Sequence, residues 1–124
     1  MRKLSILLAE DDEMIRKITT FYLHRNGHEV DIAKNGCEAV TRFKSKQYDV
    51  ILMDIQMPEM DGLEAVKQIR LIEQEYLAKN HITIIAVTTN SNKAECLNAG
   101  MDAYAQKPYS FEDLSSLFRT YNLV

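Results

Sequence analysis

The stretch that decides the fold is DVILMDIQMPEMDGL, residues 49–63, in which an uninterrupted apolar run ends at an aspartate. The apolar residues 50–53 fit a short strand that is buried on both faces, as in the parallel sheets of α/β proteins. Asp54 stands where this strand ends, and Asp61-Gly62 marks the start of a helix. A carboxylate at the end of a buried strand predicts a charged partner, because an isolated buried charge is costly.

Similar apolar runs recur along the chain and alternate with segments of helical period. The strand-like runs are 4–9, 29–33, 50–53, 82–88 and 102–106. Strands that alternate with helices predict a doubly wound (βα)5 α/β fold, with a parallel sheet covered by helices on both faces. The last run is only weakly apolar, which suits an edge strand. We expect residues 1–124 to form one domain.

The segments between these runs carry apolar residues at helical spacing. The stripes are Ile15, Ile18 and Tyr22; Cys37, Val40 and Phe43; Leu63, Val66 and Ile69; Ala94, Leu97 and Asn98; and Phe111, Leu114, Leu117, Phe118 and Tyr121. Ser110, with Asp113 three residues later, predicts a capping box at the start of the last helix. Gly100 predicts the end of the helix before it.

Composition excludes several classes of protein. The net charge of −3 argues against the usual basic surface of a nucleic-acid-binding protein. Cys37 and Cys96 lack the spacing of a disulfide framework or a zinc site, so we expect both to be buried or half-buried in a reducing compartment. No apolar segment approaches the roughly 20 residues that span a bilayer, and the N-terminus lacks a signal-peptide cleavage site. These features predict a cytoplasmic protein.

Polar residues follow the carboxyl ends of four expected strands, where ligands bind in open parallel sheets. They are Glu10, Asp11 and Asp12; Asp54; Thr88 and Thr89; and Lys107 with Pro108. Several carboxylates at one edge repel one another, and Mg²⁺ removes that conflict because it prefers oxygen ligands. The pattern therefore predicts a Mg²⁺ site at which an aspartate accepts a phosphoryl group, with Lys107 and the Thr88 hydroxyl contacting the phosphoryl oxygens.

Simpler roles are open for some of these residues. The three acids after the first strand can cap the following helix and complement its dipole, and for Asp12 we favour this role. Thr88 suits a strand for its shape alone. Lys34 and Arg70 are expected to be solvated charges near helix ends.

The motifs ILLAEDDEMIR, ILMDIQMPEMDGLEAV, IIAVTT and NAGMDAYAQKPY, with the final amphipathic helix, resemble a response-regulator receiver domain over essentially the whole chain. The resemblance implies a flavodoxin-like sheet in the order 2-1-3-4-5. It also implies phosphorelay signalling, with a histidine kinase or histidine phosphotransfer protein as phosphodonor and a downstream target protein as output. Helix 1, which carries Ile15, would be the docking face for the phosphotransfer partner. Such a domain assists only its own phosphorylation and dephosphorylation.

The same resemblance assigns roles to individual residues. It implies Asp54 as phosphoryl acceptor; Asp11, Asp54 and the backbone carbonyl of Gln56 as Mg²⁺ ligands, with Glu10 acting through a metal-bound water; Thr88 and Lys107 as phosphoryl contacts; and Tyr104 as the aromatic switch residue. The Lys107–Pro108 peptide bond would be cis. An ordinary edge-strand role for Tyr104 stays open.

Two departures from the family pattern concern the region after the fourth strand. Residues 88–100 are shorter than usual by about one helical turn, which affects the output face. Thr89 stands where a very small residue is common, and Gln56 flanks the same approach to Asp54. We expect both to change the lifetime of an aspartyl phosphate.

Three alternatives are weighed against a stand-alone receiver. The chain could be a receiver from a hybrid sensor histidine kinase, although Met1 and the compact ends favour a stand-alone protein. It could be a receiver-like interaction module that is never phosphorylated, but the complete set of acids, threonine and lysine argues against this. An aspartate-nucleophile phosphatase would need a second acid at position 56, where Gln56 cannot act as a general acid or base.

Overall fold

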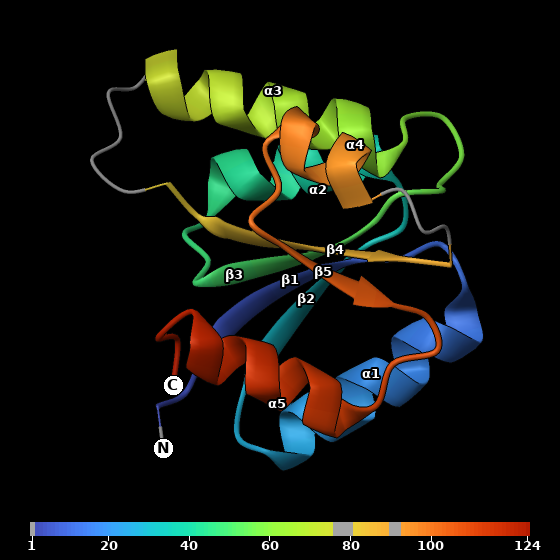
Figure 1. Ribbon diagram of the computed structural model, residues 1–124, viewed down its shortest axis with the longest axis vertical. Helices are drawn as coiled ribbons and strands as arrows, with labels where there is room; N and C mark the ends of the chain where they lie inside the picture. The colour runs from blue at the N-terminus through green and yellow to red at the C-terminus, as the bar shows by residue number, and fades with distance from the viewer. Residues whose placement is uncertain (1, 76–80, 90–92) are drawn as a thin grey trace.

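The computed structural model describes residues 2–75, 81–89 and 93–124, and the strands and helices alternate along them as expected (Figure 1). The elements are β1 (Ser5–Ala9), α1 (Glu13–Arg25), β2 (Glu29–Ala33), α2 (Gly36–Ser45), β3 (Val50–Asp54), α3 (Gly62–Glu75), β4 (Thr83–Thr88), α4 (Lys93–Ala99), β5 (Ala103–Gln106) and α5 (Phe111–Thr120). No helix in these ranges has both the length and the apolar character needed to cross a bilayer.

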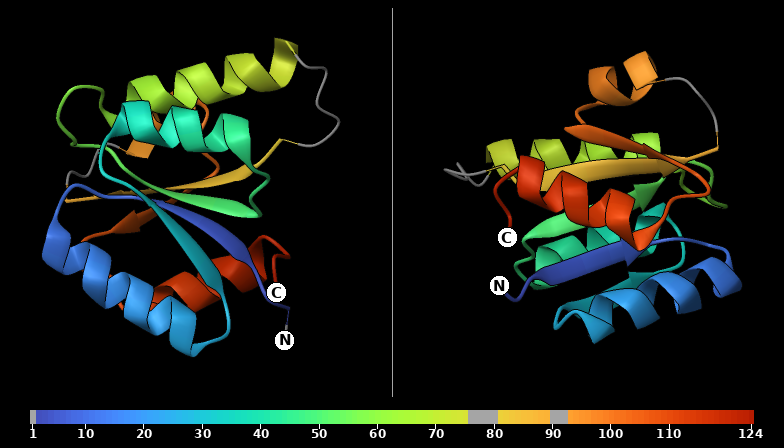
Figure 2. Two further views of the ribbon diagram at one scale, coloured as in Figure 1. Left: turned by 180° about the vertical axis from the view of Figure 1, so that it is seen from behind. Right: turned by 60° about the horizontal axis from the view of Figure 1, so that its bottom comes forward.

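The strands form one parallel sheet in the order β2-β1-β3-β4-β5, which confirms the predicted topology. The views in Figures 1 and 2 show three layers, with α1 and α5 on one face of the sheet and α2, α3 and α4 on the other. β5 lies at one edge, as its weakly apolar sequence predicted. Because all strands run in the same direction, their carboxyl ends meet at one edge of the sheet.

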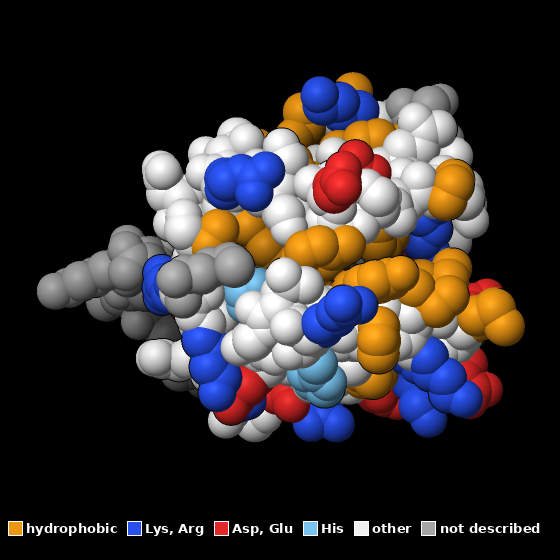
Figure 3. All heavy atoms as spheres, turned by 90° about the horizontal axis from the view of Figure 1, so that it is seen from below, with side chains coloured by type: hydrophobic (Ala, Val, Ile, Leu, Met, Phe, Trp, Pro, Cys, Tyr) orange, Lys and Arg blue, Asp and Glu red, His pale blue; other side chains and the backbone are white. Residues whose placement is uncertain are grey.

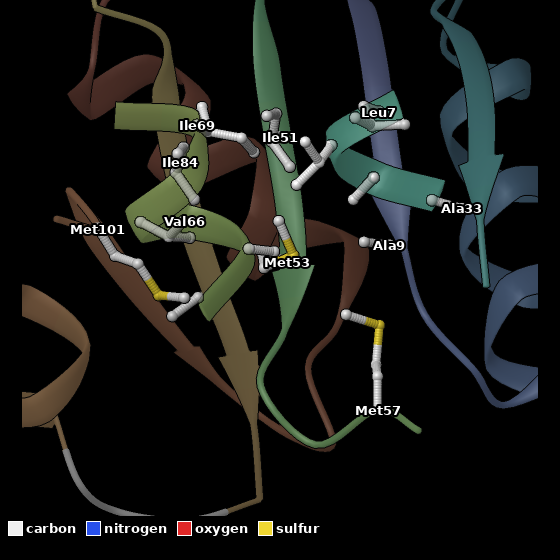
Figure 4. Close-up of a cluster of buried hydrophobic side chains, with 14 of the residues drawn as sticks. Leu7, Ala9, Ala33, Ile51, Met53, Met57, Val66, Ile69, Ile84 and Met101 are labelled. Atoms are coloured by element: carbon white, nitrogen blue, oxygen red, sulfur yellow. The ribbon is translucent and has the colours of Figure 1, made fainter. Parts of the chain in front are cut away.

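Side chains of the central strands alternate between two cores. On β3, Ile51 and Met53 join the core under α2, α3 and α4, here called the α2–α4 core and drawn in Figure 4. Val50 and Leu52 face the other side and join Phe118 of α5 in the α1–α5 core. All five are fully or almost fully buried. This two-sided burial explains why the strand reads as a continuous apolar run.

Local signals place several helix ends correctly. Asp12 caps α1 by accepting a hydrogen bond from the backbone N–H of Ile15 at 3.0 Å. Ser110 and Asp113 form the predicted capping box at α5. Gly100 follows α4 with a φ of +111°, a left-handed conformation that glycine adopts without strain. These contacts satisfy terminal backbone groups that would otherwise lack partners.

Three expectations from the sequence are wrong because tertiary contacts decide them. Cys96 is buried as expected, but Cys37 is exposed on the first turn of α2. Leu97 lies on the outer side of α4 and is 44% exposed, so the buried residue of that helix is Cys96. Arg70 is not a solvated charge: its side chain is 14% exposed and forms ion pairs with Glu73 and Asp102.

The apolar stripe of α1 lies on the outside of the molecule. The buried residues of this helix are Thr19 and Leu23. Ile18 and Tyr22, which the helical period singles out, are 52% and 43% exposed. Hydrophobic periodicity identified a real face of α1, but the tertiary structure leaves much of that face uncovered.

Candidate functional site

The acids predicted to act together do meet at the carboxyl edge of the sheet. Glu10 directly follows β1, and its backbone N–H donates to the carbonyl of Ala33 at 2.9 Å. Asp54 is the last residue of the neighbouring strand β3. Both carboxyl-bearing residues are buried, whereas Asp11, one residue further along, is exposed. The sheet therefore places two acids in a site that is largely shielded from solvent and a third at the solvent-exposed edge of that site.

The loop after Asp54 is closed on itself and joined to the start of α2 by backbone hydrogen bonds. The N–H of Gly62 donates to the carbonyl of Ile55 at 2.9 Å, and the N–H of Gly36 donates to that of Met60 at 2.8 Å. A Cβ at Gly62 would overlap the carbonyl oxygen of Asp54, so only glycine allows α3 to start this close to β3. The glycine in the opening motif thus helps to build the site.

Lys107 reaches this acidic pair from beyond β5. Its Nζ atom lies 2.7 Å from Oε1 of Glu10 and 3.2 Å from Oδ2 of Asp54. The backbone N–H of Lys107 donates to the carbonyl of Thr88 at 2.8 Å, which anchors the lysine at the end of β4. The Lys107–Pro108 peptide bond is cis, as the resemblance implied.

Burial dominates the proton equilibria of the site. Burial and, next, the nearby Glu10 carboxyl raise the pKa of Asp54 from 3.8 to about 7, although the charge of Lys107 opposes both effects. For Lys107, burial alone would lower the pKa, but its hydrogen bond to Glu10 and the charge of Asp54 outweigh burial and raise it. Asp54 therefore holds its proton more tightly than an exposed aspartate does, although Lys107 lies beside it.

The geometry of the acids suits a cation. One carboxylate oxygen from each of Glu10, Asp11 and Asp54 can be chosen so that all three lie within 4.8 Å of one another. Oxygen ligands of this kind are those that Mg²⁺ and Ca²⁺ prefer. The backbone N–H of Gln56 donates to Oδ1 of Asp54 at 3.3 Å, so the residue implied as a further ligand lies beside the same carboxylate.

The other predicted residues lie at or near this edge. Thr88 ends β4 and is 1% exposed, and its neighbour Thr89 is exposed. Tyr104 pairs in register with Ala86 and packs half-buried against the α2–α4 core. The side chain of Gln56 points into solvent. Residues 90–92, part of the segment expected to be shortened, lie outside the described residues; the helix that follows them, α4, has seven residues.

Sequence reasoning missed Arg16, whose side chain is hydrogen-bonded to the acidic segment that follows β1. Its Nη1 atom donates to the backbone carbonyls of Glu10 and Asp11, both at 2.9 Å. The side chain reaches back from the first turns of α1 and ties both carbonyls to one cation. An arginine in a helix after an acidic pair has no distinctive spacing, so only the structure reveals this contact.

Comparison with known proteins agrees with the geometry. The family model of the response regulator receiver domain matches residues 6–119. The chain is 36% identical to a probable histidine kinase of Oryza sativa subsp. indica over 96% of its own length, and 43% identical to a hybrid signal transduction histidine kinase of Dictyostelium discoideum over 88%. It spans only 15% and 6% of the lengths of these two proteins.

Solved structures give the same result. A receiver domain of a sensor histidine kinase from Pseudomonas aeruginosa, with magnesium in its active site cleft, matches with a TM-score of 0.85 and 31% identity, covering 96% of this chain and 97% of that one. The receiver domain of a Saccharomyces cerevisiae response regulator, crystallised with its histidine phosphotransfer protein, matches with a TM-score of 0.84 and 32% identity, covering 91% and 84%. The chain belongs to the family of response regulator receiver domains.

Proposed function

We propose that this receiver domain accepts a phosphoryl group on Asp54 in the presence of Mg²⁺. The observation that carries the proposal is the convergence of Asp54, Glu10 and Lys107, with the lysine nitrogen 2.7 and 3.2 Å from the two carboxylates. A carboxylate nucleophile, flanking acids for a metal ion and a fixed cation are the parts that phosphoryl transfer to an aspartate requires. The domain acts on no separate substrate, so it is a signalling module rather than a metabolic enzyme.

The proposed reaction transfers a phosphoryl group from a partner's phosphohistidine. An oxygen of the Asp54 carboxylate attacks the phosphorus, and an O–P bond forms as the P–N bond breaks. The leaving imidazole nitrogen keeps the electron pair of that bond and takes up a proton from solvent. Attack needs the ionised carboxylate, and Lys107 favours this form, although burial and Glu10 still raise the pKa of Asp54 to about 7.

The residues present fit a bound Mg²⁺. Asp11, Asp54 and the backbone carbonyl of Gln56 would hold it directly, and Glu10 would act through a metal-bound water. The carboxylate oxygens within 4.8 Å of one another favour a hard cation there, since a cation would relieve the repulsion by Glu10 that helps to raise the pKa of Asp54. When bound, it supplies positive charge to the oxygens of the transferring group. Lys107 would add a second positive charge, from a nitrogen 2.7 Å from Glu10 and 3.2 Å from Asp54.

The proposed switch joins Thr88 and Tyr104 to the phosphorylated site. A phosphoryl group on Asp54 would attract the Thr88 hydroxyl at the end of β4. That movement would let the ring of Tyr104, on the adjacent strand β5, turn inward and shift a two-state equilibrium. The output surface would be the face formed by β4, α4, β5 and α5, and a downstream target protein would bind there.

The uncovered face of α1 is the proposed docking site for a histidine phosphotransfer protein or kinase. Figure 3 shows hydrophobic side chains gathered in a band on this side of the molecule, with lysines and arginines around it. The exposed apolar residues of α1 are Met14, Ile18, Phe21 and Tyr22, between 43% and 70% exposed. An apolar patch rimmed by charge is typical of a protein-binding surface. Free thiols at Cys37 and Cys96 agree with a reducing compartment such as the cytoplasm.

The test is to incubate the protein with acetyl phosphate and Mg²⁺ and measure its intact mass. We expect one phosphoryl adduct that is lost in Asp54→Asn. The matched control is Asp12→Asn, because Asp12 caps α1 and asparagine caps equally well. The adduct should persist in this control. If the wild-type protein forms no adduct with donor and metal in excess, the domain is instead a binding module that is not phosphorylated.

A further inference from the structure

A partly buried hydrogen bond ties α1 to the loop that carries Lys107. The hydroxyl oxygens of Thr19 and Tyr109 are 2.9 Å apart, and either group can donate. Thr19 is one of two buried residues on α1 and is 6% exposed. Tyr109 follows Lys107 by two positions and packs its ring against the α1–α5 core.

The contact lies at the centre of a short loop that is fixed at both ends. At the β-sheet end, the backbone of Lys107 is hydrogen-bonded to Thr88. At the helical end, Ser110 and Asp113 form the capping box of α5. Between these anchors, Tyr109 is the residue that links the loop to α1. The loop is therefore held against the sheet, α5 and α1 together.

The two hydroxyls do more than fill space. A phenylalanine at position 109 and a valine at position 19 would occupy nearly the same volume, without the cost of removing two polar groups from water. The hydrogen bond between the two hydroxyls offsets this desolvation cost only when the Tyr109 ring and α1 keep one relative position. The neighbouring hydroxyl of Thr20 is also buried but has no hydrogen-bond partner among the described residues.

We propose that Thr19 and Tyr109 are positioning residues that hold Lys107 where it contacts Asp54 and the incoming phosphoryl group. This inference rests on the role proposed above for Lys107. The lysine stem is flexible, so the position of its nitrogen depends on the backbone from which it extends. Loss of the hydrogen bond lets the loop shift at its centre, and small displacements of a catalytic group slow a reaction.

The first test compares single and double variants. Tyr109→Phe and Thr19→Val are each expected to lower the rate constant for adduct formation from acetyl phosphate by about three- to tenfold, as befits one lost hydrogen bond. The double variant should lose no more than either single one. Thr19→Ser keeps the hydroxyl and should restore most of the rate. Thr20→Val, which removes the unpartnered hydroxyl next to it, should leave the rate unchanged. A wild-type rate in Tyr109→Phe would overturn the inference.

The second test asks whether the pair acts through Lys107. In a Lys107→Ala background, adding Tyr109→Phe should leave the already reduced rate unchanged. An equal fold-loss in that background would show that the pair only supports the fold, and would overturn the inference. Thermal unfolding of each variant shows that rates are compared between folded proteins.

A spectroscopic readout separates this inference from the proposed function. The backbone amide signals of Lys107 and Thr88 in a ¹H–¹⁵N spectrum should shift in Tyr109→Phe and stay in place in Thr20→Val. Unmoved signals would overturn the positioning role even if the wild-type protein is phosphorylated. A wild-type protein that forms no adduct would refute the proposed function, while shifted signals would still show that the pair positions Lys107.

Discussion

The ammonium nitrogen of Lys107 lies 3.2 Å from Oδ2 of Asp54, although the strands that lead to these residues, β5 and β3, are separated by β4. The same nitrogen contacts Glu10 at 2.7 Å. One cation therefore compensates two buried carboxylates across the carboxyl edge of the sheet. The charge balance of this edge determines how the protein responds to substitution, pH and metal.

Replacing the lysine should weaken the fold without abolishing it. Lys107→Met leaves Glu10 and Asp54 without their shared cation, and we expect a loss of about 1–3 kcal/mol in the free energy of unfolding at neutral pH without metal. Mg²⁺ should recover part of this loss, since it supplies the missing positive charge. Urea unfolding with EDTA and with Mg²⁺ measures both effects. A variant that does not fold under either condition would contradict a functional role for Lys107.

We expect the metal-free domain to become less stable as pH rises, because Asp54 loses the proton that the folded protein binds more tightly than the unfolded chain. The pKa of Asp54 is raised from 3.8 to about 7 in the folded protein, so between these values the unfolded chain has lost a proton that the folded protein keeps. Stability contributed by this group is therefore present below about pH 4 and is lost as pH rises toward 7. Asp54→Asn removes the effect.

Urea unfolding of the wild-type protein and Asp54→Asn in EDTA, across this pH window, tests the sign. The variant should gain stability relative to the wild-type protein as pH rises, and the difference should level off above the folded pKa. A difference that is constant with pH would mean that Asp54 titrates at its ordinary value in the folded protein.

Mg²⁺ should stabilise the domain, and Asp11 should be required. A ligand at one hundred times its dissociation constant adds about 2.7 kcal/mol to the free energy of unfolding. Asp11 is exposed, so Asp11→Asn should change metal-free stability by less than about 0.5 kcal/mol. It should nevertheless remove most of the gain from Mg²⁺, as measured by thermal unfolding. If Asp12→Asn loses this gain as well as Asp11→Asn, the metal-binding acids are Asp11 and Asp12 rather than Glu10 and Asp11.

The ion-pair network around Arg70 should contribute strongly to stability. Its guanidinium contacts Glu73 at 2.8 Å and Asp102 at 2.9 Å, and its Nε donates to the carbonyl of Gly100 at 2.9 Å. Arg70→Met removes the guanidinium from two largely buried carboxylates, which keep hydrogen bonds from the backbone N–H groups of Ile82 and Ile84, and should cost about 3 kcal/mol. Lys67→Met, at an exposed position on the same helix, should cost less than about 0.5 kcal/mol.

Denaturant unfolding of these two variants gives the comparison. The double variant Arg70→Met/Asp102→Asn should lose less unfolding free energy than the two single variants together, because both substitutions remove partners of the same network. Additive losses would mean that the two side chains stabilise the fold independently, despite the contact between Nη2 of Arg70 and Oδ2 of Asp102.

The parts of the fold that the sequence predicted depend on local physics. Strands buried on both faces read as continuous apolar runs, and the run ending at Asp54 matches β3 to within one residue. The capping box at Ser110 and the left-handed Gly100 are signals that span a few residues. Parallel strands bring their carboxyl ends to one edge, so the chain alone predicted that Glu10, Asp11, Asp54 and Lys107 would meet.

Contacts between distant segments could not be predicted in this way. The helical period of α1 identified an apolar face, but only packing decided that Thr19 and Leu23 face the core while Ile18 stays exposed. Arg70 pairs with Glu73 on its own helix, but its other partners, Gly100 and Asp102, lie 30 and 32 residues further along the chain, and no local pattern marks them.

The sequence by itself thus determined the order of strands and helices, several helix ends and which acids meet at the edge of the sheet, since each follows from backbone geometry and from burial along one segment. Only the tertiary structure decided how strongly Asp54 holds its proton, which face of α1 stays exposed, and that Thr19 meets Tyr109. Those properties depend on distances between side chains far apart in the chain, and they exist only when the whole domain has folded.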